Sequence, residues 1–178
     1  MNFIDPPLCY WVCQLIQFWK TPGLLGAIDT CTLKGKRDFA LLAVLLGCGL
    51  RRAELIAIKV GDFEQRDGHW LLPDMLGKGG HIRTVPVPGW VKAAVDRWTR
   101  AAGIATGPVF RTVDRADQVW GEGIDTKVIW KVVRRRAQAC GLENVAPHDF
   151  RRYAESRTMP NALVGSALTS QSRQDDSA

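Results

Sequence analysis

Hydrophobic and polar residues follow patterns along the chain that predict several helices. From Lys34 onward, the stretch DFALLAVLLGCGL is apolar on every side, which is typical of a fully buried helix. A second, short helix is expected in RRAELIAI. An amphipathic helix that stops near Gly103 is predicted by five residues at helical spacing, Val91, Ala94, Val95, Trp98 and Ala101.

A small antiparallel sheet of two or three strands is predicted in the middle of the chain. Asp67-Gly68 lies between DFEQR and HWLL, and such a pair is the strongest short-range hairpin signal. A second glycine-rich turn, GKGG, precedes RTVPVP, whose prolines suit an edge strand. After a short connector, GPVF, a longer helix is expected from Ile124 to Cys140, and Pro147 suits the first turn of another. The predicted fold class is α+β, mainly α-helical with a small antiparallel sheet.

The length of 178 residues, of which 46% are hydrophobic, allows one well-buried domain and is too short for two. Residues 1–33 are interpreted as a lead-in without its own core, because Pro6-Pro7 and Thr21-Pro22-Gly23 interrupt it. Residues 34–157 form the predicted domain. Residues 158–178 are small and polar without a sustained period, so we expect a disordered tail.

Charge and cysteine content narrow the classes of partner and cofactor. The chain has 24 Lys and Arg against 18 Asp and Glu, a net charge of +6, which favours nucleic acid as a polyanionic partner. The five cysteines are scattered without a CxxC pair, and the histidines have no ligand spacing, so neither metal nor disulfides are expected. The apolar run LCYWVCQLIQFW is shorter than the ~20 residues of a membrane span. We therefore expect a cytoplasmic protein without membrane attachment.

Four residues are candidates for chemistry: Arg51 in GCGLRRAEL, Lys78 in GKGG, and the pair His148 and Arg151. His148 and Arg151 are three residues apart and share a helix face, where an anion between them would make them useful neighbours. Each also has a structural alternative. Arg51 can be a helix-surface charge paired with Glu54, Lys78 an exposed turn residue, and His148 a helix cap.

Three motifs occur in the order seen in tyrosine recombinases: GLRRAEL, GKGGHIRTVPVP and PHDFRR. The chain resembles the catalytic domain of this phage-integrase family from about Lys34 to Arg157. The resemblance implies the DNA breaking-rejoining fold, DNA integration and recombination by transesterification at a scissile phosphate, and no metal or nucleotide cofactor. It assigns Arg51 and Arg151 as the two catalytic arginines, Lys78 as the hairpin lysine and His148 as the histidine of the H-x-x-R box. Glu54 would support this set.

The residue types suit that reaction. The pentavalent transition state gathers negative charge on phosphate oxygens, and guanidinium groups are always charged and bond such oxygens in a fork. A flexible lysine can give a proton to the leaving 5′-oxygen, and the histidine can accept one or bond the phosphate. Double-stranded DNA is the expected partner, bound by five further cations, Lys127, Lys131, Arg134, Arg135 and Arg152. The alternative for the first four is a solvated basic helix face.

The sequence departs from the family pattern at the nucleophile. Tyr10 and Tyr153 are the only tyrosines, and no Tyr, His or Trp follows Tyr153. Tyr153 is two positions beyond Arg151, about 200° around a helix, so we expect it to point away from the phosphate. Tyr10 lies in the lead-in, which is too short for the family's N-terminal helical domain. We therefore expect a catalytic domain shortened at both ends and inactive alone, with full-length recombinase protomers as a second partner able to supply a tyrosine.

Other interpretations remain open. The chain can be a non-catalytic DNA-binding module, or the decayed product of a mobile-element gene. A helical DNA-binding regulator is disfavoured by the order of the three motifs.

Overall fold

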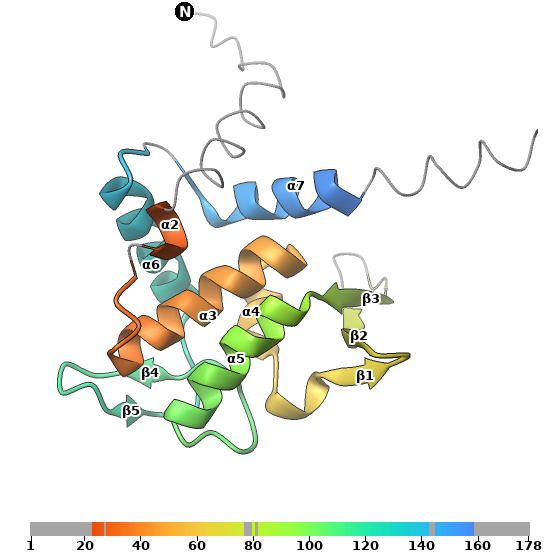
Figure 1. Ribbon diagram of the computed structural model, residues 1–178, viewed down its shortest axis with the longest axis horizontal. Helices are drawn as coiled ribbons and strands as arrows, with labels where there is room; N and C mark the ends of the chain where they lie inside the picture. Colours follow the sequence, from red (N-terminus) through yellow and green to blue (C-terminus); the bar gives the residue numbers. More distant parts are fainter. Residues whose placement is uncertain (1–22, 27, 77–79, 81, 143–144, 159–178) are drawn as a thin grey trace, which may run out of the picture.

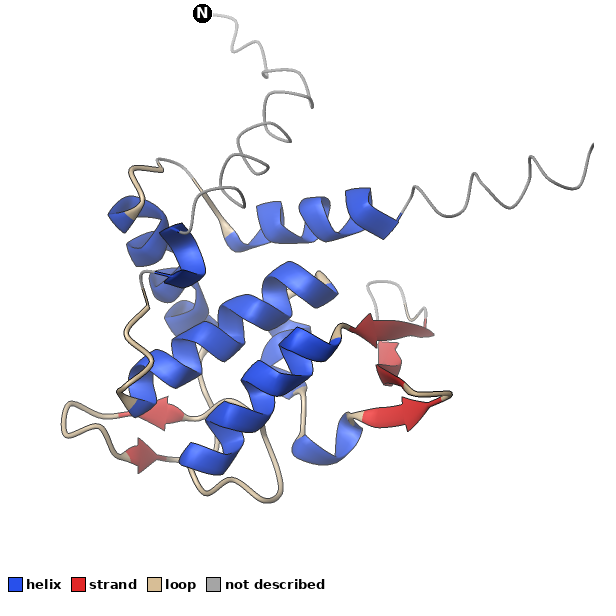
Figure 2. Ribbon diagram, viewed as in Figure 1, coloured by secondary structure: helices blue, strands red, loops and turns tan. Residues whose placement is uncertain are grey.

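The computed structural model describes residues 23–26, 28–76, 80, 82–142 and 145–158. Its helices are α2 (Gly23–Gly26), α3 (Leu33–Cys48), α4 (Arg52–Ala57), the 3-10 turn η1 (Val60–Asp62), α5 (Gly89–Ala101), α6 (Thr126–Ala139) and α7 (Pro147–Thr158). Its strands are β1 (Glu64–Arg66), β2 (His69–Leu76), β3 (Ile82–Val87), β4 (Thr112–Val113) and β5 (Val119–Trp120). The predicted class, mainly helical with a small antiparallel sheet, is confirmed (Figures 1 and 2).

Helix α3 is the central element of the core, as its uniformly apolar sequence predicts. Residues 40–46 are all buried, and α5 and α7 pack against α3 on different sides (Figure 1). Burying apolar surface all round a helix requires such neighbours, and each fully buried Leu or Val contributes about 1.5–3 kcal/mol relative to exposure. The helix begins after Thr32, whose Oγ1 accepts the N–H of Gly35 at 3.0 Å.

Gly49 ends α3 and allows α7 to approach it. Its φ of 60° lies in the left-handed region, and its N–H donates to the carbonyl of Leu45 at 3.2 Å. A Cβ on Gly49 would lie 2.7 Å from the Cβ of Ala154 in α7. A glycine therefore turns the chain toward Arg51 and lets α7 pack closely against the same turn.

The larger sheet has the order β1-β2-β3 and is antiparallel throughout. Asp67 and Gly68, with φ of 49° and 77°, form the two-residue turn that the sequence predicts. β3 is an edge strand, and Pro86 lies in it opposite Leu71, as the prolines of RTVPVP indicate.

A second, two-stranded sheet of β4 and β5 follows α5, where the sequence predicts only the connector GPVF. Strands of two residues are too short to show alternation, so pattern analysis misses them. The hairpin has a clear structural task, because the Asp117 carboxylate accepts the N–H groups of Leu33 (2.7 Å) and Lys34 (3.0 Å). The hydrogen bonds from Lys34 and Leu33 lower the pKa of Asp117, as expected for an acid at a helix N-terminus.

Helix α5 is amphipathic as predicted, since Val91, Ala94, Val95 and Trp98 are buried, although Ala101 is exposed. The connector after α5 belongs to the core, because the Trp98 indole Nε1 donates to the carbonyl of Val109 at 2.8 Å.

The described part of residues 1–33 packs on this core. Ile28 is 5% exposed and belongs to the main hydrophobic cluster, against which Leu25 also lies. The division at residues 33 and 157 stays a prediction, and the expected tail from residue 159 onward lies outside the described residues. In the ranges that the structure describes, every helix is too short or too polar to cross a lipid bilayer.

Candidate functional site

Arg51 and Glu54 form the base of the site where α3 gives way to α4. Arg51 immediately precedes α4, and its backbone N–H donates to Glu54 Oε2 at 2.8 Å. Its Nη1 donates to the other carboxylate oxygen, Oε1, at 2.8 Å. The structural alternative, an Arg51–Glu54 pair three residues apart, is therefore present, with 38% of the Arg51 side chain exposed. The Glu54 side chain is only 7% exposed, so the pair reaches into the interior.

Two more arginines from distant parts of the chain reach the same carboxylate. Arg83 of β3 donates from Nη2 to Glu54 Oε2 at 2.8 Å. Arg151 of α7 places its Nη1 3.9 Å from the same oxygen. Glu54 thus lies at the meeting point of α4, β3 and α7, and three guanidinium groups surround one carboxylate.

The arginines keep Glu54 ionised. Burial alone would raise the pKa of Glu54, but the backbone N–H and guanidinium of Arg51, together with the charge and hydrogen bond of Arg83, outweigh it. The net pKa of Glu54 is lowered from its ordinary value. A carboxylate that stays charged can hold the guanidiniums of Arg51 and Arg83 in fixed orientations.

The start of α7 places the predicted pair of His148 and Arg151. The helix begins at Pro147 as predicted, but the acceptor at its start is Asp149, whose Oδ2 accepts the N–H of Ala146 at 2.8 Å. Asp149 is thus the side chain seen to accept a backbone N–H here, and the capping alternative for His148 stays a prediction. The His148 side chain is 68% exposed, with Nε2 3.3 Å from Asp149 Oδ1, whereas that of Arg151 is 23% exposed.

Of the four predicted catalytic residues, the structure brings Arg51 and Arg151 to Glu54 and leaves His148 at the exposed start of α7. Lys78 lies outside the described residues, between the ends of β2 and β3. Arg83 was not among the sequence candidates. The sequence places Arg83 in the strand that follows the glycine-rich turn, which was the available signal. Its pairing with Glu54 could not be predicted, because 29 residues separate the two positions.

Four of the five basic residues of α6 lie on a stripe distinct from its buried face, whereas Arg136 points toward the buried Asp38. The buried residues are Ile129, Val132, Val133 and Ala137. The four predicted DNA-binding residues of this helix are all exposed, Lys127, Lys131, Arg134 and Arg135. Arg152 on α7 is exposed as well. Their role in binding DNA stays a prediction.

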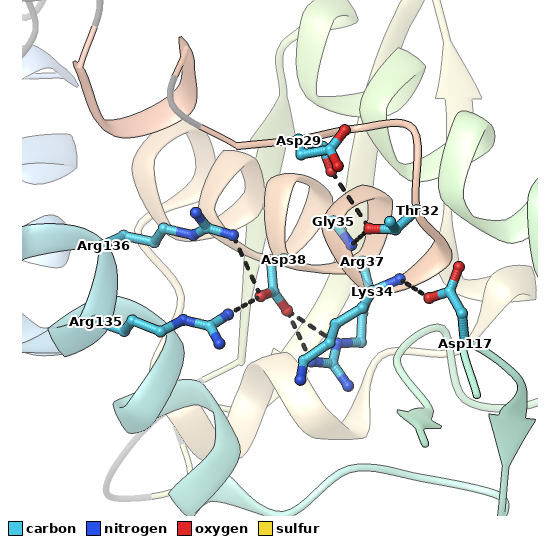
Figure 3. Close-up of polar contacts among 9 residues, drawn as sticks. All are labelled: Asp29, Thr32, Lys34, Gly35, Arg37, Asp38, Asp117, Arg135 and Arg136. Carbon is cyan, nitrogen blue, oxygen red and sulfur yellow. Dashed lines mark hydrogen bonds and ion pairs between the residues drawn. The ribbon is translucent and has the colours of Figure 1, made fainter. Parts of the chain in front are cut away.

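A buried carboxylate fixes α6 against α3 (Figure 3). Asp38 is 0% exposed, and its Oδ1 accepts Nε and Nη2 of Arg37 at 3.1 and 2.8 Å. Its Oδ2 accepts Nη2 of Arg135 at 2.9 Å, with Arg136 Nη2 at 4.0 Å. Arg135 is still 55% exposed, so it joins the core network to the basic surface.

A pocket of about 440 Å³ opens between the start of α3 and α6. Its lining is Lys34, Arg37, Val128, Trp130, Lys131, Val132, Arg134, Arg135 and Gln138. The Arg134 guanidinium stacks 5.0 Å from the centre of the Trp130 ring. None of the described residues that line this pocket is an Asp or Glu, so the start of α3 and α6 together present a second positively charged region to anions.

Comparison with known proteins identifies the family of the chain. The family model described as "Phage integrase family" matches residues 16–163. A tyrosine recombinase of Synechocystis sp. is 32% identical over 126 residues, covering 69% of this chain and 39% of that protein. The tyrosine recombinase XerD of Listeria monocytogenes serotype 4b is 27% identical over 143 residues, covering 78% of this chain and 46% of that protein.

Solved structures agree on the fold. A XerH site-specific recombinase bound to difH substrate superposes with a TM-score of 0.62 at 18% identity, covering 97% of this chain and 50% of that chain. XerA recombinase gives a TM-score of 0.54 at 18% identity, covering 85% of this chain and 49% of that chain. The chain spans about two fifths to one half of the length of these relatives. With the order of its three motifs and the family match over most of its length, the chain belongs to the phage integrase family of tyrosine recombinases.

Proposed function

We propose that this chain is a DNA-binding domain of a site-specific recombinase, in which Arg51 and Arg151 bind the scissile phosphate. The observation that carries the proposal is the gathering of guanidinium groups around Glu54. Guanidiniums are the side chains best suited to bind phosphate oxygens in a fork and to stabilise the charge that develops on them. The family relatives and a neighbour solved with its DNA substrate support the same function.

His148 and Lys78 have proton-transfer roles in this proposal. His148 stands three residues before Arg151 on α7, and its side chain is open to solvent. It accepts a proton from the attacking hydroxyl or bonds a phosphate oxygen, while Lys78 gives a proton to the departing 5′-oxygen. Neither step needs a metal, because side chains supply both the positive charge and the protons.

The exposed cations of α6, with Arg152, hold the DNA backbone. Helix α6 presents four of these cations to solvent, Lys127, Lys131, Arg134 and Arg135. Contacts of this kind are independent of sequence, and non-specific complexes have dissociation constants of about 10⁻⁴–10⁻⁶ M at physiological salt. We expect weak, sequence-tolerant binding to duplex DNA.

The nucleophile comes from elsewhere in this proposal. Covalent catalysis needs an oxygen that attacks in line, and the spacing of Tyr153 from Arg151 does not suit that task. The attacking tyrosine in this proposal therefore lies outside these 178 residues, and a full-length recombinase protomer can supply it in trans.

The experiment is incubation with a nicked suicide duplex that carries the recombination site of a full-length relative, followed by a denaturing gel. An adduct that forms only when the relative is added, and that decreases when Arg51→Ala replaces the wild-type chain, supports the proposal. An adduct formed by this chain alone and abolished by Tyr153→Phe would show that the nucleophile is present. DNA binding without any adduct under either condition would favour a non-catalytic DNA-binding module.

A further inference from the structure

The cluster around Glu54 carries more positive charge than it can neutralise internally. Arg51, Arg83 and Arg151 are each permanently charged, and Glu54 supplies one negative charge. The formal charges of these four side chains sum to +2. A phosphodiester carries one negative charge, and the pentavalent state of its transesterification carries two. With Arg83 included, the four side chains have a charge equal and opposite to that of the pentavalent state.

Arg83 has donors available for such an anion. A guanidinium has five N–H donors, and among the residues that the structure describes Arg83 uses one, from Nη2 to Glu54. Its side chain is 31% exposed, close to the 38% of Arg51 and above the 23% of Arg151. Arg83 is thus oriented by Glu54 on one side and open to solvent on another.

The contact with Glu54 also determines where Arg83 lies relative to Arg51. Oε1 of Glu54 accepts the Arg51 guanidinium and Oε2 accepts that of Arg83, both at 2.8 Å. One rigid carboxylate therefore holds two guanidiniums side by side, and the 3.9 Å approach of Arg151 brings a third. An anion beside Arg51 and Arg83 would be attracted by both of these positive charges.

We propose that Arg83 is a third phosphate-binding guanidinium of this site, which contacts the same DNA phosphate as Arg51 and Arg151. This assignment rests on the proposed function of the site. It predicts that Arg83 neutralises a phosphate, and not only that it attaches β3 to α4.

The first test is the salt dependence of duplex DNA affinity, measured by fluorescence anisotropy between 50 and 200 mM salt, for the wild type, Arg83→Ala and Arg83→Lys. Each neutralised phosphate contributes about 0.9 to the slope of log K against log salt. Because three arginines share one phosphate, we expect Arg83→Ala to weaken binding and to lower the slope by at most about 0.9, and Arg83→Lys, which keeps the charge, to restore most of it.

Arg66→Ala is the matched control. Arg66 is also an arginine of the three-stranded sheet paired with a glutamate, Glu64, but the two side chains are 59% and 46% exposed and lie on β1, the opposite edge of the sheet from β3. We expect Arg66→Ala to leave the slope unchanged. Thermal unfolding of each variant establishes that it is folded at the binding temperature.

A second measurement is independent of the stability of the alanine variant. In a ¹⁵N spectrum of the arginine Nε groups of the wild type, the Arg83 resonance, assigned by its loss in R83K, shifts as duplex DNA is added. Arg51→Ala is the positive control and should lower the slope. If it does, an unchanged slope in Arg83→Ala together with an unmoved Arg83 resonance at saturating DNA would overturn the assignment. If the wild type itself shows no salt-dependent binding, the proposed function fails instead.

Discussion

Replacing Glu54 by Gln tests the role of the buried carboxylate most directly. Glutamine keeps the size of the side chain and one oxygen, but removes the negative charge that three guanidiniums share. Removing one partner of a buried ion pair costs about 3–5 kcal/mol. The arginines keep 23–38% of their side chains exposed, so water screens part of the repulsion, and we expect a loss of about 2–3 kcal/mol in the free energy of unfolding.

The pH dependence of this loss follows from the lowered pKa of Glu54. In the unfolded chain the carboxyl titrates near its ordinary value of 4.5, and in the folded protein it titrates lower. Between those two values the unfolded state binds more protons, so the stability that ionised Glu54 contributes is complete above pH 4.5 and declines as pH falls through the folded pKa. The difference between the wild type and Glu54→Gln should therefore be larger at pH 7 than near pH 3.

Urea titrations at the two pH values measure that difference. Glu64→Gln is the control, because Glu64 pairs with Arg66 on the surface and its loss should cost less than about 1 kcal/mol at either pH. An equal effect of the two substitutions at pH 7, or an effect of Glu54→Gln that does not change with pH, would refute the reasoning.

Three further predictions concern positions outside this cluster. Asp38→Asn should lower the free energy of unfolding by about 3–5 kcal/mol in a denaturant titration, because it leaves the buried Arg37 guanidinium without its counter-charge. A loss below about 1 kcal/mol would show that the network is not needed to hold α6. Gly49→Ala should cost at least about 1–2 kcal/mol from its left-handed backbone, and more from the contact with Ala154 at 2.7 Å; an unchanged melting temperature would contradict the close approach of α7. Burial raises the pKa of Cys48 to about 12, so a maleimide at pH 8 should label exposed Cys31 in the native protein and Cys48 only after denaturation; labelling of native Cys48, read by peptide mass spectrometry, would count against that burial.

Sequence patterns predict the elements whose signals are local. The apolar run of α3 reports its burial, and Asp67-Gly68 reports its turn, because each depends on neighbouring residues alone. The β4–β5 hairpin gives no such signal, since its strands have two residues each. Its contribution, the Asp117 carboxylate at the start of α3, is formed between residues more than 80 positions apart.

The candidate site divides in the same way. Arg51, His148 and Arg151 are predicted because short motifs carry them, and the pairing of Arg51 with Glu54 follows from helix spacing. The convergence of Arg83 and Arg151 on Glu54 depends on how β3 and α7 pack, which no local pattern encodes.

Asp38 was missed for another reason. It lies beside Arg37 in the sequence, where an adjacent acid and base are typical of a solvated helix start, yet it is buried. The position of this acid at the edge of the apolar run was the available signal for its burial. Its partner Arg135 lies 97 residues away, so no local pattern indicates the pair.

The measurement that tests the central claim most directly is the salt dependence of duplex DNA binding by the wild type and by the double variant Arg51→Ala/Arg151→Ala. If both guanidiniums bind the one scissile phosphate, the slope of log K against log salt falls by about 0.9 in the double variant, while Arg66→Ala keeps the wild-type slope. A double variant that is folded and binds DNA with the wild-type slope would contradict the account, because the guanidiniums around Glu54 would then contact no phosphate.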